Sequence, residues 1–178
     1  QENGYLLFVG RLTPEKGVHH LVEAFRDLRT ERRLVIVGDN PYDRPYVERL
    51  RAQADERVLF AGYRFDDEFA QLMRHCAIYV QPSEVEGTSP VLLTAMGYGR
   101  PVIVQGIPEN LETIGDAGLA FAPGRVDELG SHLQRLLDDP EEARAWGTAA
   151  EARVREVYDW DDISRRFATV CARAESAF

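Results

Sequence analysis

Lysine is almost missing from this sequence, because only Lys16 is a lysine among the 21 lysine and arginine residues. Cysteine is scarce as well, and Cys76 and Cys171 stand far apart without forming a CxxC pair. This excludes a disulfide framework and favours reduced thiols in a cytoplasmic protein. Long apolar runs are also lacking, since none approaches the roughly 20 residues of a membrane-spanning helix. We therefore expect no transmembrane segment.

Several strong site motifs are absent too. The chain contains neither GxGxxG nor a Walker loop ending in GK[ST]. Its histidines, His19, His20, His75 and His132, show no zinc-ligand spacing, so no metal site is predicted. Residues 159–161 read DWD, like a metal–diphosphate motif, but they stand where a late helix is predicted to start. We interpret them as acidic residues that cap this helix and complement its dipole.

Positive charge is in the minority, with 21 basic against 30 acidic residues and a net charge of −9 at pH 7. Such a balance argues against a nucleic-acid partner, because the phosphate backbone attracts basic surfaces. Apolar residues make up 44% of the 178 residues, which excludes disorder and can fill one sizeable core. Because no repeat or linker marks a boundary, we expect a single domain over residues 1–178.

Short apolar runs rich in branched side chains predict strands that are covered on both faces. They lie at residues 5–9, 34–37, 58–61, 78–80, 102–104 and 119–121. Apolar spacings of three and four predict helices over 18–28, 126–137 and 140–150, and a last helix over about 161–174. The alternation predicts a Rossmann-like α/β fold, a doubly wound parallel sheet of about six strands. Ligands of such sheets bind at the carboxyl ends of the strands.

The first strand-to-helix turn carries Gly10, Arg11, Lys16 and Gly17. Two cations beside a helix N-terminus make a plausible anion site, since unpaired N–H groups and the helix dipole both favour negative charge. A solvated turn with surface ion pairs to Glu15 is an equally good interpretation of this turn alone.

The next two turns carry weaker signals. Gly38 follows the second strand, where ordinary turn chemistry explains it. Tyr63 and Arg64 follow the third strand, and an aromatic ring with a guanidinium could flank a nucleobase there. Surface residues look the same, so a surface turn is favoured on these residues alone.

The fourth turn, residues 81–90, is polar and leads into the apolar segment 91–97. A helix that is apolar all round is buried, so its N-terminus would point from the core into the crevice and favour an anion. Glu86 stands at the mouth, where a carboxylate can accept bonds from sugar hydroxyls. The alternative is that Glu84 and Glu86 only complement the helix dipole, but the buried helix favours function. Together, the four strand ends suit a ligand with a diphosphate, a base and a polyol.

Four stretches, 8–25, 57–63, 82–104 and 106–121, resemble in order and spacing the C-terminal, donor-binding domain of retaining glycosyltransferases of the GT-B fold, family 4 or group 1 type. The resemblance implies transfer of a hexose-type sugar from a nucleotide sugar to a glycan, lipid or other acceptor, without metal or cofactor. It implies a missing N-terminal domain that supplies the acceptor pocket, so the chain alone should be inactive. The last helix would pack back toward that domain. The resemblance also fits a cytoplasmic protein, which would be peripheral at the inner face of the membrane when its acceptor is lipid-linked.

The family pattern also implies roles for individual residues. Arg11 and Lys16 would neutralise the diphosphate, acting as catalytic residues together with Glu86, the first acid of the Glu-x7-Glu motif. Backbone N–H groups would surround the sugar and β-phosphate, and the nucleobase would lie between Tyr63 and Arg64. The full expected donor-binding set is Gly10, Gly38, Tyr63, Arg64, Gly87, Thr88, Ser89, Val91, Leu92 and Thr94.

Thr94 departs from the family pattern, because the second glutamate of Glu-x7-Glu is expected there. A hydroxyl cannot hold two ribose oxygens as a carboxylate can, although it can bond one. Two alternatives therefore stay open. One is a non-catalytic nucleotide-sugar-binding module, a pseudo-glycosyltransferase, and the other is a related enzyme such as a sugar-nucleotide epimerase.

Overall fold

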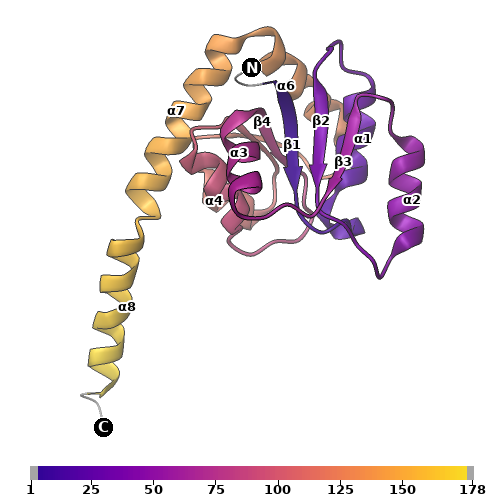
Figure 1. The fold of residues 1–178 in the computed structure, drawn as a ribbon. Helices are drawn as coiled ribbons and strands as arrows, with labels where there is room; N and C mark the ends of the chain where they lie inside the picture. Colours follow the sequence, from indigo (N-terminus) through magenta and orange to yellow (C-terminus); the bar gives the residue numbers. More distant parts are fainter. Residues whose placement is uncertain (1–3, 176–178) are drawn as a thin grey trace.

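The computed structural model describes residues 4–175 and contains one six-stranded parallel sheet (Figure 1). Its strands lie in the order β3-β2-β1-β4-β5-β6, so the chain runs outward from β1 to β3 and returns beside β1. The strands are β1 (Tyr5–Val9), β2 (Arg33–Val37), β3 (Val58–Gly62), β4 (Cys76–Gln81), β5 (Val102–Gln105) and β6 (Leu119–Phe121). The predicted doubly wound sheet is thereby confirmed.

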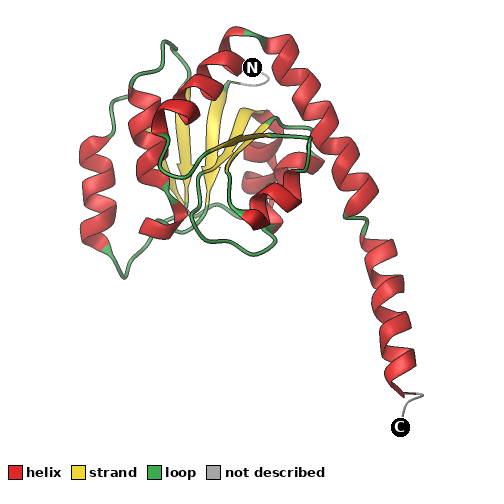
Figure 2. Ribbon diagram, turned by 180° about the vertical axis from the view of Figure 1, so that it is seen from behind, coloured by secondary structure: helices red, strands yellow, loops and turns green. Residues whose placement is uncertain are grey.

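Helices cover both faces of the sheet (Figure 2). They are η1 (Pro14–Lys16), α1 (Val18–Arg26), α2 (Arg44–Gln53), α3 (Asp66–His75), α4 (Pro90–Gly97), α5 (Pro108–Ile114), α6 (Val126–Asp138), α7 (Pro140–Val157) and α8 (Trp160–Glu175). One core lies between the sheet and α1, α2 and α6, and the other includes side chains of α3, α4 and α7. Apolar spacing did not predict α2, α3 or α5, because each buries only one to three side chains.

The central strand shows why the apolar runs are continuous. Leu6 and Phe8 of β1 point into the first core and Leu7 into the second, and all three are fully or almost fully buried. A strand with helices on both faces needs apolar residues at successive positions. The prediction of two covered faces is wrong for β3, where Leu59 is exposed, because this strand forms the edge of the sheet.

Arg57, at the start of β3, ties that edge to the end of α1. Its guanidinium donates two hydrogen bonds to Oδ2 of Asp55, at 2.6 and 3.1 Å. It also donates to the carbonyl oxygens of Phe25, Arg26, Leu28 and Thr30. Phe25 and Arg26 end α1 and Leu28 and Thr30 follow it, so one side chain bonds four carbonyl oxygens around the C-terminus of this helix. The hydrogen bond from Arg57 lowers the pKa of Asp55 below its ordinary value.

The chain ends in two consecutive helices of different character. α7 begins at an Asp139 cap and packs against α4, whereas α8 extends away from the domain (Figure 1). Along α8, Trp160, Phe167 and Val170 are exposed. Asp159 accepts a hydrogen bond from the N–H of Asp162 at 2.8 Å, which confirms the DWD segment as a helix cap.

The two cysteines lie in opposite environments. Cys76 is buried at the start of β4, and burial raises the pKa of its thiol to about 12. Cys171 is exposed on α8, and both thiols are free. Among the described residues, no helix is long and apolar enough to cross a membrane.

Candidate donor-binding site

A cavity of about 250 Å³ lies at the carboxyl ends of β1 and β4, where the strand order reverses. This is where open parallel sheets bind their ligands. Seven of the predicted residues line it: Gly10, Arg11, Lys16, Glu86, Thr88, Ser89 and Val91. The other expected residues, Gly38, Tyr63, Arg64, Gly87, Leu92 and Thr94, do not line it.

Lys16 and Glu86 form an ion pair across this cavity, with Nζ 2.5 Å from Oε1. Both side chains are largely buried, with 19% and 12% of their surface exposed. Lys16 thus pairs with Glu86, on the loop between β4 and α4, rather than with its sequence neighbour Glu15. Arg11 lies exposed at the edge of the cavity.

Close backbone contact holds the two loops of this ion pair together. Gly17 has a φ of +65°, and a Cβ built there would lie 1.9 Å from the carbonyl oxygen of Pro82. Only glycine permits this conformation and this approach. The N–H of Glu84 donates to the carbonyl oxygen of Glu15 at 2.8 Å, adding a direct bond between the loops.

The N-terminus of α4 faces the cavity, because residues just before this helix and at its start line the cavity. Ser89 caps the helix, and its Oγ accepts from the N–H of Leu92 at 3.3 Å. Because of this bond, the N–H of the buried residue Leu92 is already paired. Val91, in contrast, lines the cavity. The prediction that α4 is buried all round is wrong, because its residues Pro90 and Gly97 are exposed.

A buried polar network fixes the start of α4. The Gln81 Oε1 accepts hydrogen bonds from Ser89 Oγ at 2.9 Å and Tyr79 Oη at 3.3 Å. The Gln81 Nε2 donates to Asn110 Oδ1 at 2.9 Å, and Asn110 Nδ2 donates to the carbonyl oxygen of Gln105. Burial raises the pKa of Tyr79, so its hydroxyl stays protonated as a donor. Sequence reasoning missed this network, although a glutamine that ends an apolar strand was a signal.

Ser83 is a second residue that sequence reasoning missed. Its side chain is 1% exposed and lines the cavity, and its Oγ has no hydrogen-bond partner among the described residues. A buried hydroxyl without a partner is costly, so its presence beside a cavity points to a ligand that bonds it.

The remaining predicted residues surround the cavity at greater distance. Gly38, with φ of +125°, brings the end of β2 against the end of β1, since a Cβ there would lie 1.9 Å from the Gly10 carbonyl oxygen. Tyr63 donates from its hydroxyl to the carbonyl oxygen of Asp39, and Arg64 is exposed beside it. Thr94 donates its hydroxyl to the carbonyl oxygen of Pro90 at 2.8 Å, back along its own helix.

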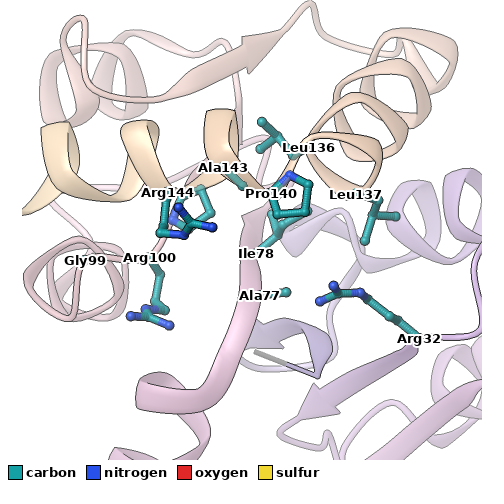
Figure 3. Close-up of a pocket in the computed structure, with 11 residues that line it drawn as sticks. Arg32, Ala77, Ile78, Gly99, Arg100, Leu136, Leu137, Pro140, Ala143 and Arg144 are labelled. Atoms are coloured by element: carbon teal, nitrogen blue, oxygen red, sulfur yellow. The ribbon is translucent and has the colours of Figure 1, made fainter. Parts of the chain in front are cut away.

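A different cavity, also of about 250 Å³, lies at the opposite end of the sheet (Figure 3). It is lined by Ala77 and Ile78 of β4 and by three arginines, Arg32, Arg100 and Arg144. Arg100 donates to the carbonyl oxygens of Tyr98 and Cys76, so it holds the start of β4 in place. None of the predicted donor-binding residues reaches this end.

The sequence matches the family model described as "Glycosyl transferases group 1" over residues 3–139. It is 31% identical over 157 residues to O-antigen chain mannosyltransferase B of Escherichia coli, covering 84% of this chain and 40% of the relative. It is 35% identical over 148 residues to 2-deoxystreptamine glucosyltransferase of Streptomyces kanamyceticus, covering 79% and 38%. The chain thus spans less than half of these relatives.

Solved structures agree with the sequence matches. HepE of Anabaena in complex with UDP superposes with a TM-score of 0.89 at 26% identity, over 97% of this chain and 49% of that one. The same protein in complex with UDP-glucose gives 0.88 at 25% identity, over 96% and 49%. The chain therefore belongs to the group 1 glycosyl transferases, as a C-terminal domain of a GT-B glycosyltransferase.

Proposed function

We propose that this chain binds the nucleotide-sugar donor of a retaining glycosyltransferase, which transfers a hexose to a glycan, a lipid or another acceptor. The observation that carries the proposal is the pairing of Lys16 with Glu86 in a cavity that also holds the unpaired hydroxyl of Ser83. A cation, a carboxylate and a hydroxyl at one helix N-terminus suit a sugar diphosphate. The complexes of HepE with UDP and UDP-glucose support this ligand class.

Glycosyl transfer leaves negative charge on the departing diphosphate while the anomeric carbon becomes cationic. Groups that are fixed in advance toward the leaving group stabilise this transition state. Lys16, Arg11 and the N-terminus of α4 would supply them, with backbone N–H groups of Thr88, Ser89 and Val91 around the β-phosphate. No metal is needed for this role. Retention would follow from attack on the same face, assisted by the leaving phosphate, as in the family that the sequence resembles.

The carboxylate of Glu86 would then accept hydrogen bonds from hydroxyls of the donor sugar. The nucleotide would extend past Gly38, at the end of β2, toward Tyr63 and Arg64, at the end of the neighbouring strand β3. Thr94 can bond one ribose oxygen after it gives up its hydrogen bond to Pro90.

The acceptor would bind outside this chain, and this part of the proposal is supported by the chain's coverage of only 38–49% of the relatives and structures named above. An N-terminal domain would supply the acceptor pocket, and the exposed apolar residues of α8 would pack against it. The isolated domain would bind donor without transferring the sugar. We place the whole protein in the cytoplasm, at the inner face of the membrane when its acceptor is lipid-linked.

Calorimetry of the chain against UDP, GDP, ADP and their hexose conjugates tests this function. We expect one nucleotide to bind and its affinity to fall in both Arg11→Ala and Lys16→Ala. Arg26→Ala, which removes an exposed arginine at the far end of α1, is the matched control. Failure of every nucleotide to bind, both to this chain and to the full-length enzyme, would overturn the proposal.

The non-catalytic alternative rests on Thr94, whose hydroxyl is already bonded within its helix. A transfer assay with the full-length protein separates the two functions. Donor binding without transfer or donor hydrolysis, over a panel of acceptors, would identify a binding module. Conversion of the nucleotide sugar without any acceptor would instead indicate an epimerase.

A further inference from the structure

Three metal-binding side chains converge beside the donor cavity but outside it. They are His19 and His20, near the start of α1, and Glu84, on the loop between β4 and α4. One ligand atom from each lies within 4.8 Å of the others. His20 and Glu84 are 64 positions apart, so no local spacing in the sequence could reveal this cluster.

We propose that His19, His20 and Glu84 bind one divalent transition-metal ion, with zinc as the best fit. Two imidazoles and one carboxylate are a donor set that zinc accepts, with water at the fourth position. The imidazole nitrogens favour zinc, nickel, copper or cobalt, whereas magnesium and calcium take oxygen ligands.

The distances within the cluster are close to those that coordination requires. Nε2 of His20 lies 3.2 Å from Oε1 of Glu84. Two ligands of a tetrahedral zinc, each at about 2.0–2.1 Å, are about 3.3 Å apart. The imidazole rings of His19 and His20 have centroids 4.0 Å apart, so the two neighbouring side chains turn toward each other.

A contact at the other ring nitrogen also orients the imidazole of His19, as is usual for metal-bound histidines. Its Nδ1 lies 3.1 Å from the hydroxyl of Tyr46, a buried residue of α2. When Nδ1–H donates to that hydroxyl, Nε2 carries the lone pair that a metal needs. Burial lowers the pKa of His19, which favours this neutral form of the ring.

The position of the cluster indicates what the metal would do. It would connect α1 with the loop that carries Glu86, and the backbone bond from Glu84 to Glu15 already joins this loop to η1, which directly precedes α1. His19, His20 and Glu84 do not line the donor cavity, so the metal would not touch the diphosphate. It would be a structural clip that holds the two cavity loops together, separate from the chemistry of transfer.

Titration of tag-free, metal-stripped protein with Co²⁺ and Zn²⁺ tests the proposal. We expect one equivalent of Co²⁺ to give the visible absorption of a tetrahedral site and Zn²⁺ to displace it. Zn²⁺ should raise the melting temperature of the wild-type chain, because an ion that binds only the folded state stabilises it. His20→Gln and Glu84→Gln should each weaken zinc binding at least about tenfold.

His75→Gln is the matched control, because His75 is a half-buried histidine on α3 outside the cluster. Its metal affinity should equal that of the wild type. Glu84 is exposed, so its substitution leaves the fold intact and keeps the test informative. Absence of stoichiometric binding up to millimolar metal, or equal affinity in wild type, His20→Gln and Glu84→Gln, would overturn the proposal. Nucleotide calorimetry in the presence of a chelator tests the donor site independently.

Discussion

The ammonium of Lys16 lies 2.5 Å from the carboxylate of Glu86, so these two charged groups in the lining of the donor cavity neutralise each other. A bound diphosphate would compete with Glu86 for the ammonium, while the sugar would give Glu86 new hydroxyl partners. The ion pair would thus couple recognition of the phosphate to recognition of the sugar. A nucleoside diphosphate without a sugar would break the pair and leave Glu86 without compensation.

Glu86→Gln should separate these two effects. Loss of the carboxylate leaves Lys16 available and removes repulsion of the diphosphate, so we expect the nucleoside diphosphate to bind about tenfold more tightly. The advantage of the nucleotide sugar over the diphosphate should shrink or disappear. Calorimetric dissociation constants for both ligands measure this, with Glu84→Gln in chelator as the control. Tighter binding of the nucleotide sugar without tighter binding of the nucleoside diphosphate would contradict the role assigned to Glu86.

Lys16→Ala should weaken donor binding by about 10–150-fold, the range that a charge-assisted hydrogen bond of about 1.5–3 kcal/mol represents. The variant also leaves the largely buried Glu86 carboxylate without its partner. The same calorimetry measures the affinity, which should depend less steeply on salt than in the wild type because one cation of the site is gone. Unchanged affinity would remove Lys16 from the donor site.

Ser83→Ala should make the free protein more stable and its complex weaker. Alanine removes a buried hydroxyl that has no partner among the described residues, which should stabilise the unliganded fold by about 1 kcal/mol. The same change removes a hydrogen bond to the donor, and affinity should fall several-fold. Denaturant unfolding and calorimetry on one preparation measure both quantities. A variant that is less stable without ligand would show that Ser83 is satisfied within the protein.

Thr94→Glu should tighten nucleotide binding about tenfold, because a carboxylate can hold both ribose hydroxyls. Thr94 is only partly buried and its hydroxyl bonds its own helix, so a longer side chain can reach out of α4. Thr94→Ala, the control, should change affinity less than twofold. Comparison of ribose with 2′-deoxyribose nucleotides checks the mechanism: the gain in affinity must vanish with the deoxy ligand.

Asp55→Asn should destabilise the domain by about 1 kcal/mol at pH 7 by weakening the Arg57 clamp on α1. The pKa of Asp55 is lowered in the folded protein, so the unfolded chain binds its proton more readily. The stabilisation is therefore complete above about pH 4, the ordinary value for aspartate, and is lost as the pH falls through the folded pKa. Urea unfolding between pH 2.5 and 7 should show the two proteins converging in acid. Asp27→Asn, at an exposed site, should follow the wild type throughout.

The sequence predicted the sheet because its signal is local. Continuous apolar runs mark β1 and the strands beside it, and turn residues at their ends mark the cavity. The pairing of Lys16 with Glu86 joins residues 70 positions apart, so no periodicity contains it. The network around Gln81 depends in the same way on Asn110, which α5 brings from another part of the chain. The sequence does not distinguish Arg57 from a surface arginine, because only the fold places the end of α1 next to it.

The contrast between the two thiols makes the chain its own reporter of domain assembly. Cys76 is buried and its raised pKa keeps it protonated, whereas Cys171 lies exposed on α8. A maleimide dye added to the unmodified sequence should therefore attach to the projecting helix alone. Its emission would change if α8 docks against a second domain, so docking of this chain could be followed without introducing a substitution into it.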